Sequence, residues 1–271
     1  MKIITNKTEL QNAITTLKKQ GKTIGFAPTM GALHAGHMSL YDIAKQNADI
    51  IVASIFVNPA QFAPNEDFDS YPRREQEDLD KLEKQGVDIA YLPKKEDLYP
   101  ECFDLKISVG KIGQILEGVT RPHFFDGVAL VVTKLFMQVT PDVAVFGEKD
   151  FQQLHVIKQV AKWLDMPIKI IGAPIVREAS GLAMSSRNLY LCHEQRKIAS
   201  SLYKTMCDIK NKKITIEQAK KDLIKSGFDK VDYLELRDAN TLYEQTSSTQ
   251  ESRLLAAVYI GSIRLIDNIE V

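Results

Sequence analysis

Short apolar runs rich in β-branched residues alternate with amphipathic helical patterns over residues 8–174 of this 271-residue chain. The clearest run, DIIVASIFVN at residues 49–58, is typical of a parallel strand that is covered on both faces. We expect strands at residues 23–30, 49–58, 88–93, 142–147 and 167–174. We expect helices at residues 8–21, 37–48, 73–85, 126–140 and 150–165. Repeated βα units of this kind predict an α/β fold with a doubly wound parallel sheet.

The pattern changes after about Asn188. Helical patterns near residues 194–210 and 216–226 precede strand patterns at 231–238, 253–261 and 263–271, with a polar loop at 240–252. This order predicts a smaller α+β domain with antiparallel strands. The boundary is expected between residues 175 and 190, and we divide the chain into residues 1–177 and 178–271.

Charge and composition narrow the classes of partner. Lys plus Arg and Asp plus Glu number 35 each, so the formal net charge is zero, which disfavours a broad nucleic-acid or membrane surface. The three cysteines are scattered and form no C-x-x-C motif, as expected for reduced thiols. The first residues, MKIITNKTEL, contain no apolar signal region, and no apolar run approaches a membrane span of about 20 residues. We therefore expect a cytoplasmic protein that acts on small molecules.

Several local patterns have structural interpretations. Thr8 followed by Gln11 is a capping-box pattern for the first helix. His155 and His193 fall within or near predicted helices, where a structural role is the simpler interpretation. Trp163 is expected to pack in the core, together with Val160 and Leu164.

Polar clusters follow the predicted strands. They are PTMGALHAGH, NPAQF and GEKDFQQ, each directly after a strand, and MSSRN after PIVREASGLA. In a parallel sheet the first three clusters share the carboxyl edge, where ligands of such folds bind.

The first of these clusters suits a phosphate. Gly31 and Gly36 allow backbone N–H groups to approach phosphate oxygens, and a helix N-terminus near His37 adds a positive dipole. His34 and His37 are three positions apart, so both imidazoles can point the same way and donate to a phosphoryl group.

The later clusters add charge and hydroxyl groups. Lys149 offers a point charge where a helix opens, and Asp150 suits the helix N-cap. Ser185, Ser186 and Arg187 combine two hydroxyls and a guanidinium in a loop that could close over phosphates. Taken alone, each cluster could also be a turn or a capped helix start. The acidic residues show no metal-ligand spacing, so a divalent ion is expected on nucleotide phosphates.

Longer strings carry a specific resemblance. H-A-G-H resembles the HIGH signature of a nucleotidyltransferase superfamily, and M-S-S-R-N falls where those proteins have a mobile KMSKS-type loop. The strings PTMGALHAGH, SIFVNPAQF, FGEKDFQQL, VREASGLAMSSRNLYL, DYLELRD and RLIDN together resemble the pantoate–β-alanine ligase family, over residues 24–268.

The resemblance implies a reaction in two steps. The carboxylate of pantoate attacks the α-phosphate of ATP, and the amine of β-alanine then attacks the adenylate to give pantothenate and AMP. Mg²⁺ accompanies the ATP. The implied fold is a Rossmann-like N-terminal domain with a smaller C-terminal lid domain, usually in a homodimer. No side-chain nucleophile is needed, because the substrate carboxylate is the nucleophile.

The resemblance also assigns roles to residues by motif. The residues implied to bind ATP are Met30, Gly31, Ala32, Leu33, His34, Ala35, Gly36, His37, Gly147, Glu148, Lys149, Asp150, Val176, Met184, Ser185, Ser186 and Arg187. Those implied to act in catalysis are His34, His37, Lys149, Ser185, Ser186 and Arg187. Asn58, Gln61 and Gln153 are implied to bind the substrate.

Two positions depart from the family pattern. Ala60 stands where the family usually has Met, which implies a slightly roomier pocket floor. Phe124 stands where the family usually has His, and His123 comes one position early, so no catalytic role is assigned to His123. Two alternatives remain open: a nucleotidylyltransferase that uses another small acceptor, and a non-catalytic nucleotide-binding module. Length and the lack of a basic domain disfavour an aminoacyl-tRNA synthetase.

Overall fold

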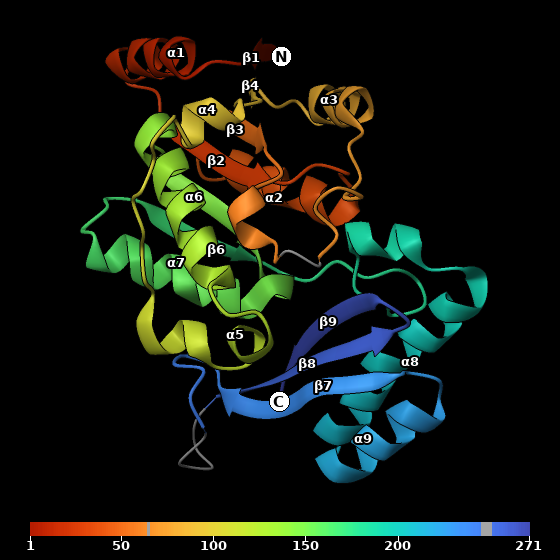
Figure 1. Cartoon of the computed structure of the whole chain (residues 1–271). Helices are drawn as coiled ribbons and strands as arrows, with labels where there is room; N and C mark the ends of the chain where they lie inside the picture. Colours follow the sequence, from red (N-terminus) through yellow and green to blue (C-terminus); the bar gives the residue numbers. More distant parts are fainter. Residues whose placement is uncertain (64–65, 245–250) are drawn as a thin grey trace. The chain divides into compact units, whose positions relative to one another are not determined.

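The chain folds into two compact units in the computed structural model, which describes residues 1–63, 66–244 and 251–271 (Figure 1). The first unit comprises Met1–Glu148 and Gln153–Ala173, and the second comprises Lys149–Gln152 and Pro174–Val271. The loop expected at 240–252 includes residues 245–250, which lie outside the described residues.

A parallel sheet forms the centre of the first unit. Its strands are β1 (Lys2–Ile4), β2 (Ile24–Thr29), β3 (Ile50–Ile55), β4 (Ile89–Tyr91), β5 (Val143–Gly147) and β6 (Lys169–Ala173). Their order is β1-β4-β3-β2-β5-β6, and each neighbouring pair is parallel. The chain moves outward in one direction from β2 to β3 and β4, and in the other direction to β5 and β6. The strand order therefore reverses between β2 and β5, where doubly wound folds bind ligands.

The helices of the first unit connect these strands. They are α1 (Lys7–Lys19), α2 (Ala35–Lys45), α3 (Glu75–Lys84), α4 (Lys95–Leu98), α5 (Glu117–Thr120), α6 (Phe124–Val139) and most of α7 (Phe151–Trp163), with 3₁₀ turns η1 (Pro59–Gln61) and η2 (Gly110–Gln114). The 3₁₀ turn η3 (Glu148–Asp150) and α7 both include residues of Lys149–Gln152, which belong to the second unit. Four consecutive residues are buried in β2 and again in β3. Successive strand side chains point to opposite faces, so both faces of the sheet centre are covered. The predicted α/β fold with a doubly wound parallel sheet is confirmed.

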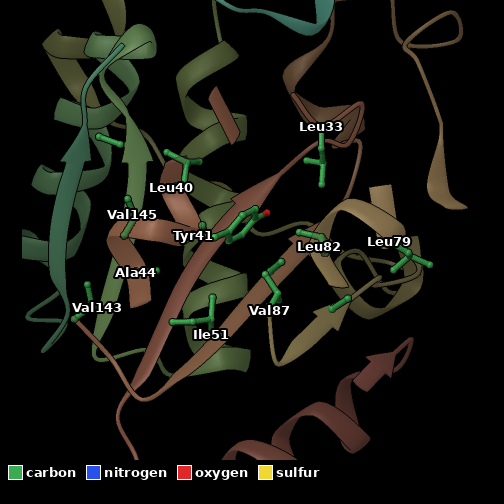
Figure 2. Close-up of a cluster of buried hydrophobic side chains, with 14 residues drawn as sticks. Leu33, Leu40, Tyr41, Ala44, Ile51, Leu79, Leu82, Val87, Val143 and Val145 are labelled. Atoms are coloured by element: carbon green, nitrogen blue, oxygen red, sulfur yellow. The ribbon is translucent and has the colours of Figure 1, made fainter. Parts of the chain in front are cut away.

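A buried apolar cluster joins the sheet to α2 and α3 (Figure 2). Its strand residues include Ile51, Val143 and Val145, and its α2 residues include Leu40 and Tyr41. Burial in this apolar surrounding raises the pKa of the Tyr41 phenol. The cluster fixes the start of α2 against the sheet, and this start carries the predicted histidine pair.

Two local predictions in the first unit are wrong. Helix α1 is capped by Asn6, whose side chain accepts a hydrogen bond from the Glu9 N–H at 2.8 Å, and not by the predicted Thr8. Trp163 is 62% exposed and Leu164 is 51% exposed, whereas Val160 is buried as expected. The reason is position, because Trp163 is the last residue of α7 and the chain leaves the sheet there.

The second unit is a small α+β domain, as predicted. Its strands β7 (Lys230–Asp238), β8 (Ser252–Ile260) and β9 (Ile263–Glu270) form an antiparallel sheet. Its helical elements are η4 (Ser186–Tyr190), α8 (His193–Lys210) and α9 (Ile216–Lys225). A separate core of buried residues from α8, α9 and the strands holds this unit together.

Candidate active site

The two histidines of the H-A-G-H motif lie side by side at the start of α2. His34 is the N-cap residue and His37 is in the first turn. Their ring centroids are 4.0 Å apart, with 32° between the ring planes. The backbone N–H of His37 donates to the His34 carbonyl at 2.8 Å. The predicted placement of both imidazoles on one helical turn is confirmed.

One hydrogen bond indicates which nitrogen of a neutral His37 ring carries the proton. Nδ1 of His37 accepts from the backbone N–H of His34 at 3.3 Å, as the third residue of a capping box does. A neutral imidazole that accepts through Nδ1 carries its proton on Nε2. The His37 ring can therefore act as a hydrogen-bond donor through Nε2, beside the positive end of the α2 dipole. This combination suits an oxyanion on which charge develops.

The turn before α2 is held by an acidic side chain of α3. Gly31 has φ +86° and Ala32 has φ +48°, so two successive residues are in the left-handed region. The backbone N–H groups of Ala32 and Leu33 donate to the carboxylate of Asp78, at 2.8 and 2.7 Å. No local pattern distinguishes Asp78, because a single acidic residue in a highly charged helix is usually solvated.

The second polar cluster follows β3 and centres on Asn58, which is only 1% exposed. Its Oδ1 accepts from the Tyr99 hydroxyl at 2.7 Å and from the Ala60 N–H at 3.2 Å, and its Nδ2 donates to the Gly127 carbonyl at 3.2 Å. Burial raises the pKa of the Tyr99 phenol to about 12, although the Asn58 hydrogen bond opposes the shift. Asn58 therefore fixes the turn that presents Gln61, a positioning role that the sequence did not predict.

Helix α6 and the segment before it hold the same turn. A Cβ at Gly127 would lie 2.1 Å from the Ala60 carbonyl oxygen, so only glycine allows this close approach. Arg121 donates to the Gln61 carbonyl at 2.9 Å. The same guanidinium forms ion pairs with Glu66 at 2.6 Å and with Glu117 at 3.0 Å.

Phe124, at the second of the two positions that depart from the family pattern, lies beside Arg121. The Phe124 ring stacks under the Arg121 guanidinium, with 3.8 Å from Cζ to the ring centroid. The His123 side chain is 90% exposed and the backbone has φ +70°. The side chain at position 124 thus supports Arg121, whereas His123 faces solvent.

The third polar cluster follows β5. Gly147 ends that strand beside β2, and Glu148 begins the 3₁₀ turn η3. Gln153 lies in the first turn of α7 and is half-buried. Strands β3, β2 and β5 are neighbours in the parallel sheet of the first unit. The polar residues of this unit that follow them therefore lie after the carboxyl ends of adjacent strands, as predicted.

Lys149 and Asp150 belong to the second unit. The Lys149 carbonyl accepts from Asn268 Nδ2 at 3.0 Å, and Asn268 Oδ1 accepts from Arg253 Nε at 2.6 Å. The Lys149 ammonium lies 3.8 Å from the Asp150 carboxylate. Asn268 on β9 was not predicted to support this turn, and its place in the R-L-I-D-N string was the only signal.

The M-S-S-R segment follows a short hairpin. The Met184 N–H donates to the Val176 carbonyl at 3.0 Å, and an isolated bridge pairs Arg177 with Ala183. The Ser185 hydroxyl oxygen accepts from the Arg187 N–H at 3.2 Å and caps η4. The second unit therefore brings these predicted nucleotide-binding residues together within one hairpin and the turn that follows it.

Within residues 1–63, 66–244 and 251–271, no group of three or more His, Cys, Asp or Glu side chains could hold a metal ion. None of the helices in the same ranges is long and apolar enough to cross a membrane.

Comparisons with known proteins agree over nearly the whole chain. A family model described as pantoate-beta-alanine ligase matches residues 2–270. The pantothenate synthetase of Ruthia magnifica subsp. Calyptogena magnifica is 53% identical over 276 residues, which cover 99% of this chain and 98% of that protein.

Solved structures agree as well. The crystal structure of pantothenate synthetase from Thermus thermophilus has a TM-score of 0.91 at 38% identity, and the match covers 100% of this chain and 99% of that one. A pantoate–β-alanine ligase from Francisella tularensis, complexed with β,γ-ATP and β-alanine, has a TM-score of 0.88 at 37% identity, with 100% and 97% covered. The chain belongs to the pantoate–β-alanine ligase family.

Proposed function

We propose that this chain condenses pantoate with β-alanine at the expense of ATP, through a pantoyl-adenylate intermediate, and releases pantothenate, AMP and pyrophosphate. The observation that carries the proposal is the paired imidazoles of His34 and His37 on the first turn of α2, in a chain that matches the ligase family over residues 2–270. The Francisella relative was crystallised with an ATP compound and β-alanine, which supports the same substrates here.

The first step transfers the adenylyl group. A carboxylate oxygen of pantoate attacks the α-phosphorus of ATP, and the bond from that phosphorus to the bridging oxygen of pyrophosphate breaks. Negative charge grows on the α-phosphate and on the leaving group as this happens. We assign His34 and His37 as the donors that stabilise this charge, with the α2 dipole aimed at the same point.

The second step forms the amide. The β-alanine amine attacks the carbonyl carbon of the adenylate, the carbon–oxygen bond to AMP breaks, and the amine loses a proton. We assign Gln61 and Gln153 to bind pantoate, because a pocket of amides suits a hydroxy acid. Asn58 contributes through the turn that it fixes, since its side chain already bonds Tyr99, Ala60 and Gly127.

We propose that residues 1–177 form the domain that binds ATP and pantoate, and that residues 178–271 form the smaller lid domain. Lys149, Ser185, Ser186 and Arg187 are assigned to the phosphates. Asp150 is assigned to the ribose, and Val176 and Met184 are assigned to the adenine. Mg²⁺ is expected to bind mainly through the ATP phosphates and to neutralise their charge. A homodimer in the cytoplasm is the proposed assembly and location.

A product assay tests the proposed function. The purified chain is incubated with ATP, Mg²⁺, pantoate and β-alanine, and pantothenate and AMP are measured by mass spectrometry. Equal amounts of pantothenate and AMP, with neither formed when pantoate is omitted, are expected. AMP transferred to a phosphate monoester, without pantothenate, would instead identify a nucleotidylyltransferase.

A further inference from the structure

Helix α3 holds the backbone of the turn that carries the histidines. Asp78 is buried, and its two carboxylate oxygens accept from the N–H groups of Ala32 and Leu33 at 2.8 and 2.7 Å. The Lys81 ammonium donates to the Leu33 carbonyl at 2.8 Å. Asp78 and Lys81 are three positions apart and share one side of the helix. The N–H and C=O groups of Leu33 are thus both bonded to α3.

The conformation of the turn explains why a carboxylate is needed there. Gly31 and Ala32 have φ values of +86° and +48°, a conformation that lets successive N–H groups converge on an anion. Ala32 is a non-glycine residue in the left-handed region, which persists only where surrounding contacts hold it. The Asp78 carboxylate supplies the anion from within the protein.

Apolar packing of the Leu33 side chain also holds this residue against α3. The Leu33 side chain is 3% exposed and belongs to the buried cluster that includes Leu79 and Leu82 of α3 (Figure 2). The backbone and the side chain of Leu33 therefore both depend on α3. Leu33 directly precedes His34, whose backbone N–H donates to His37 Nδ1. A shift of the Leu33–His34 peptide therefore displaces the donor that orients the His37 ring.

We propose that Asp78 and Lys81 are positioning residues for adenylation, which fix the histidine pair through the backbone of Leu33. The proposal rests on the function given above, in which His34 and His37 act on the phosphates. Stabilisation by oriented donors depends on their placement before the reaction, and small displacements are costly. The main effect of losing the contact to α3 is therefore expected in the rate and not in substrate affinity.

Two substitutions test the contact. Asp78→Asn keeps the shape but turns an NH₂ group toward one of the two N–H donors, and Lys81→Met keeps the stem but removes the ammonium. We expect kcat for pantoate-dependent ATP–pyrophosphate exchange to fall about 10- to 100-fold in Asp78→Asn, as for a displacement near 1 Å. The KM for pantoate should stay near the wild-type value, because Gln61 lies on a separate turn held by Asn58 and Arg121. We expect a smaller fall in kcat for Lys81→Met, and Lys81→Arg should keep most of the wild-type kcat.

Matched controls come from the exposed side of the same helix. Asp80 and Lys84 lie on α3 and are exposed, so Asp80→Asn and Lys84→Met make the same chemical changes without touching the turn. Both controls should keep wild-type kcat and KM. Thermal melts of all variants report whether a loss of rate follows from unfolding.

A readout independent of activity completes the test. Proton–carbon NMR signals of the His34 and His37 rings are recorded in the full chain without ligands. They should shift in Asp78→Asn and Lys81→Met and stay unchanged in the two controls. Unchanged ring signals and wild-type kcat in folded Asp78 and Lys81 variants would overturn the proposal, even if their melting temperatures fell. If Asp78→Asn does not fold, the Lys81 variants decide the question. A wild-type chain without exchange activity would contradict the proposed function, and the ring signals would then report on positioning alone.

Discussion

At the scale of single residues, the His37 imidazole has a structural contact as well as its proposed chemical one. Its Nδ1 accepts from the His34 N–H at 3.3 Å in a capping box at the start of α2. A substitution therefore changes helix stability and adenylation together, and the two effects must be separated.

Two variants of His37 separate them. His37→Ala loses a donor to the developing charge, which in comparable sites lowers the rate by ~10²–10³. It also loses the cap acceptor, at a cost of about 1 kcal/mol in the free energy of unfolding. His37→Gln keeps an acceptor at the third helical position, where Gln is a normal capping-box residue, so its stability should approach that of wild type. Its adenylation rate should be as low as that of His37→Ala. Recovery of the rate in His37→Gln would show that the imidazole itself is not required, because the Gln amide keeps both an acceptor and a donor.

The sequence predicted the histidines but not the residues that hold them. H-A-G-H stands out because imidazoles and glycines gather where a strand meets a helix. Asp78 and Tyr99 do not stand out, since their partners lie 45 or 46 and 41 positions away in the chain. The only local signal for Asp78 is that it directly precedes Leu79, an inward-facing position of α3.

At the scale of elements, the turn η1 is positioned by its contact with α6. Gly127 allows the Ala60 carbonyl to lie against the helix, and the Gly127 carbonyl accepts from Asn58. Helix α6 thus sets the position of the turn that presents Gln61.

Gly127→Ala tests this contact. The added methyl group would overlap the Ala60 carbonyl, so η1 or α6 must shift, and overpacking of this kind costs about 1–3 kcal/mol of folding stability. We expect the KM for pantoate to rise more than the KM for ATP, because η1 presents Gln61. Gly36→Ala is not a suitable control, since it lies in the nucleotide motif. Ala129→Gly, which removes a buried methyl group from the same helix, tests whether destabilisation of α6 alone raises the KM for pantoate. An equal rise in that KM for both variants would contradict the role of η1.

Elements were predicted well where local pattern decides them. The β-branched runs became β2, β3 and β5 because both of their faces are covered, and their neighbours in the sheet are parallel. Ends of elements were predicted less well. Asn6 and not Thr8 caps α1, and the last turn of α7 exposes Trp163, because exposure at a helix end depends on where the chain leaves the sheet.

At the scale of the whole molecule, the chain forms two compact units, and each unit contains residues from two separate stretches of the chain. Lys149–Gln152 belongs to the second unit, although β5 before it and the rest of α7 after it, from Gln153 onward, belong to the first. The bond from Asn268 to the Lys149 carbonyl joins residues 119 positions apart, so no local pattern could have predicted it.

The second unit also provides a test of ligand-dependent order. The contacts that hold residues 181–188 include the hydrogen bonds from Arg177 to the Gly181 carbonyl at 3.0 Å and from Asn188 to the Ala183 carbonyl at 3.1 Å. If Ser185, Ser186 and Arg187 bind the phosphates, amide hydrogen exchange over residues 181–188 should slow when ATP and pantoate are added. Peptides from α9 serve as the internal control and should not change. Equal exchange in residues 181–188 with and without ligands would contradict a clamp.

The central claim is that this chain activates pantoate as an adenylate before β-alanine takes part. Pantoate-dependent exchange of labelled pyrophosphate into ATP, measured without β-alanine, tests it most directly. We predict exchange that requires pantoate and Mg²⁺ and that falls ~10²–10³-fold in His37→Ala. Steady formation of pantothenate from all three substrates, with no exchange when β-alanine is omitted, would contradict the two-step mechanism.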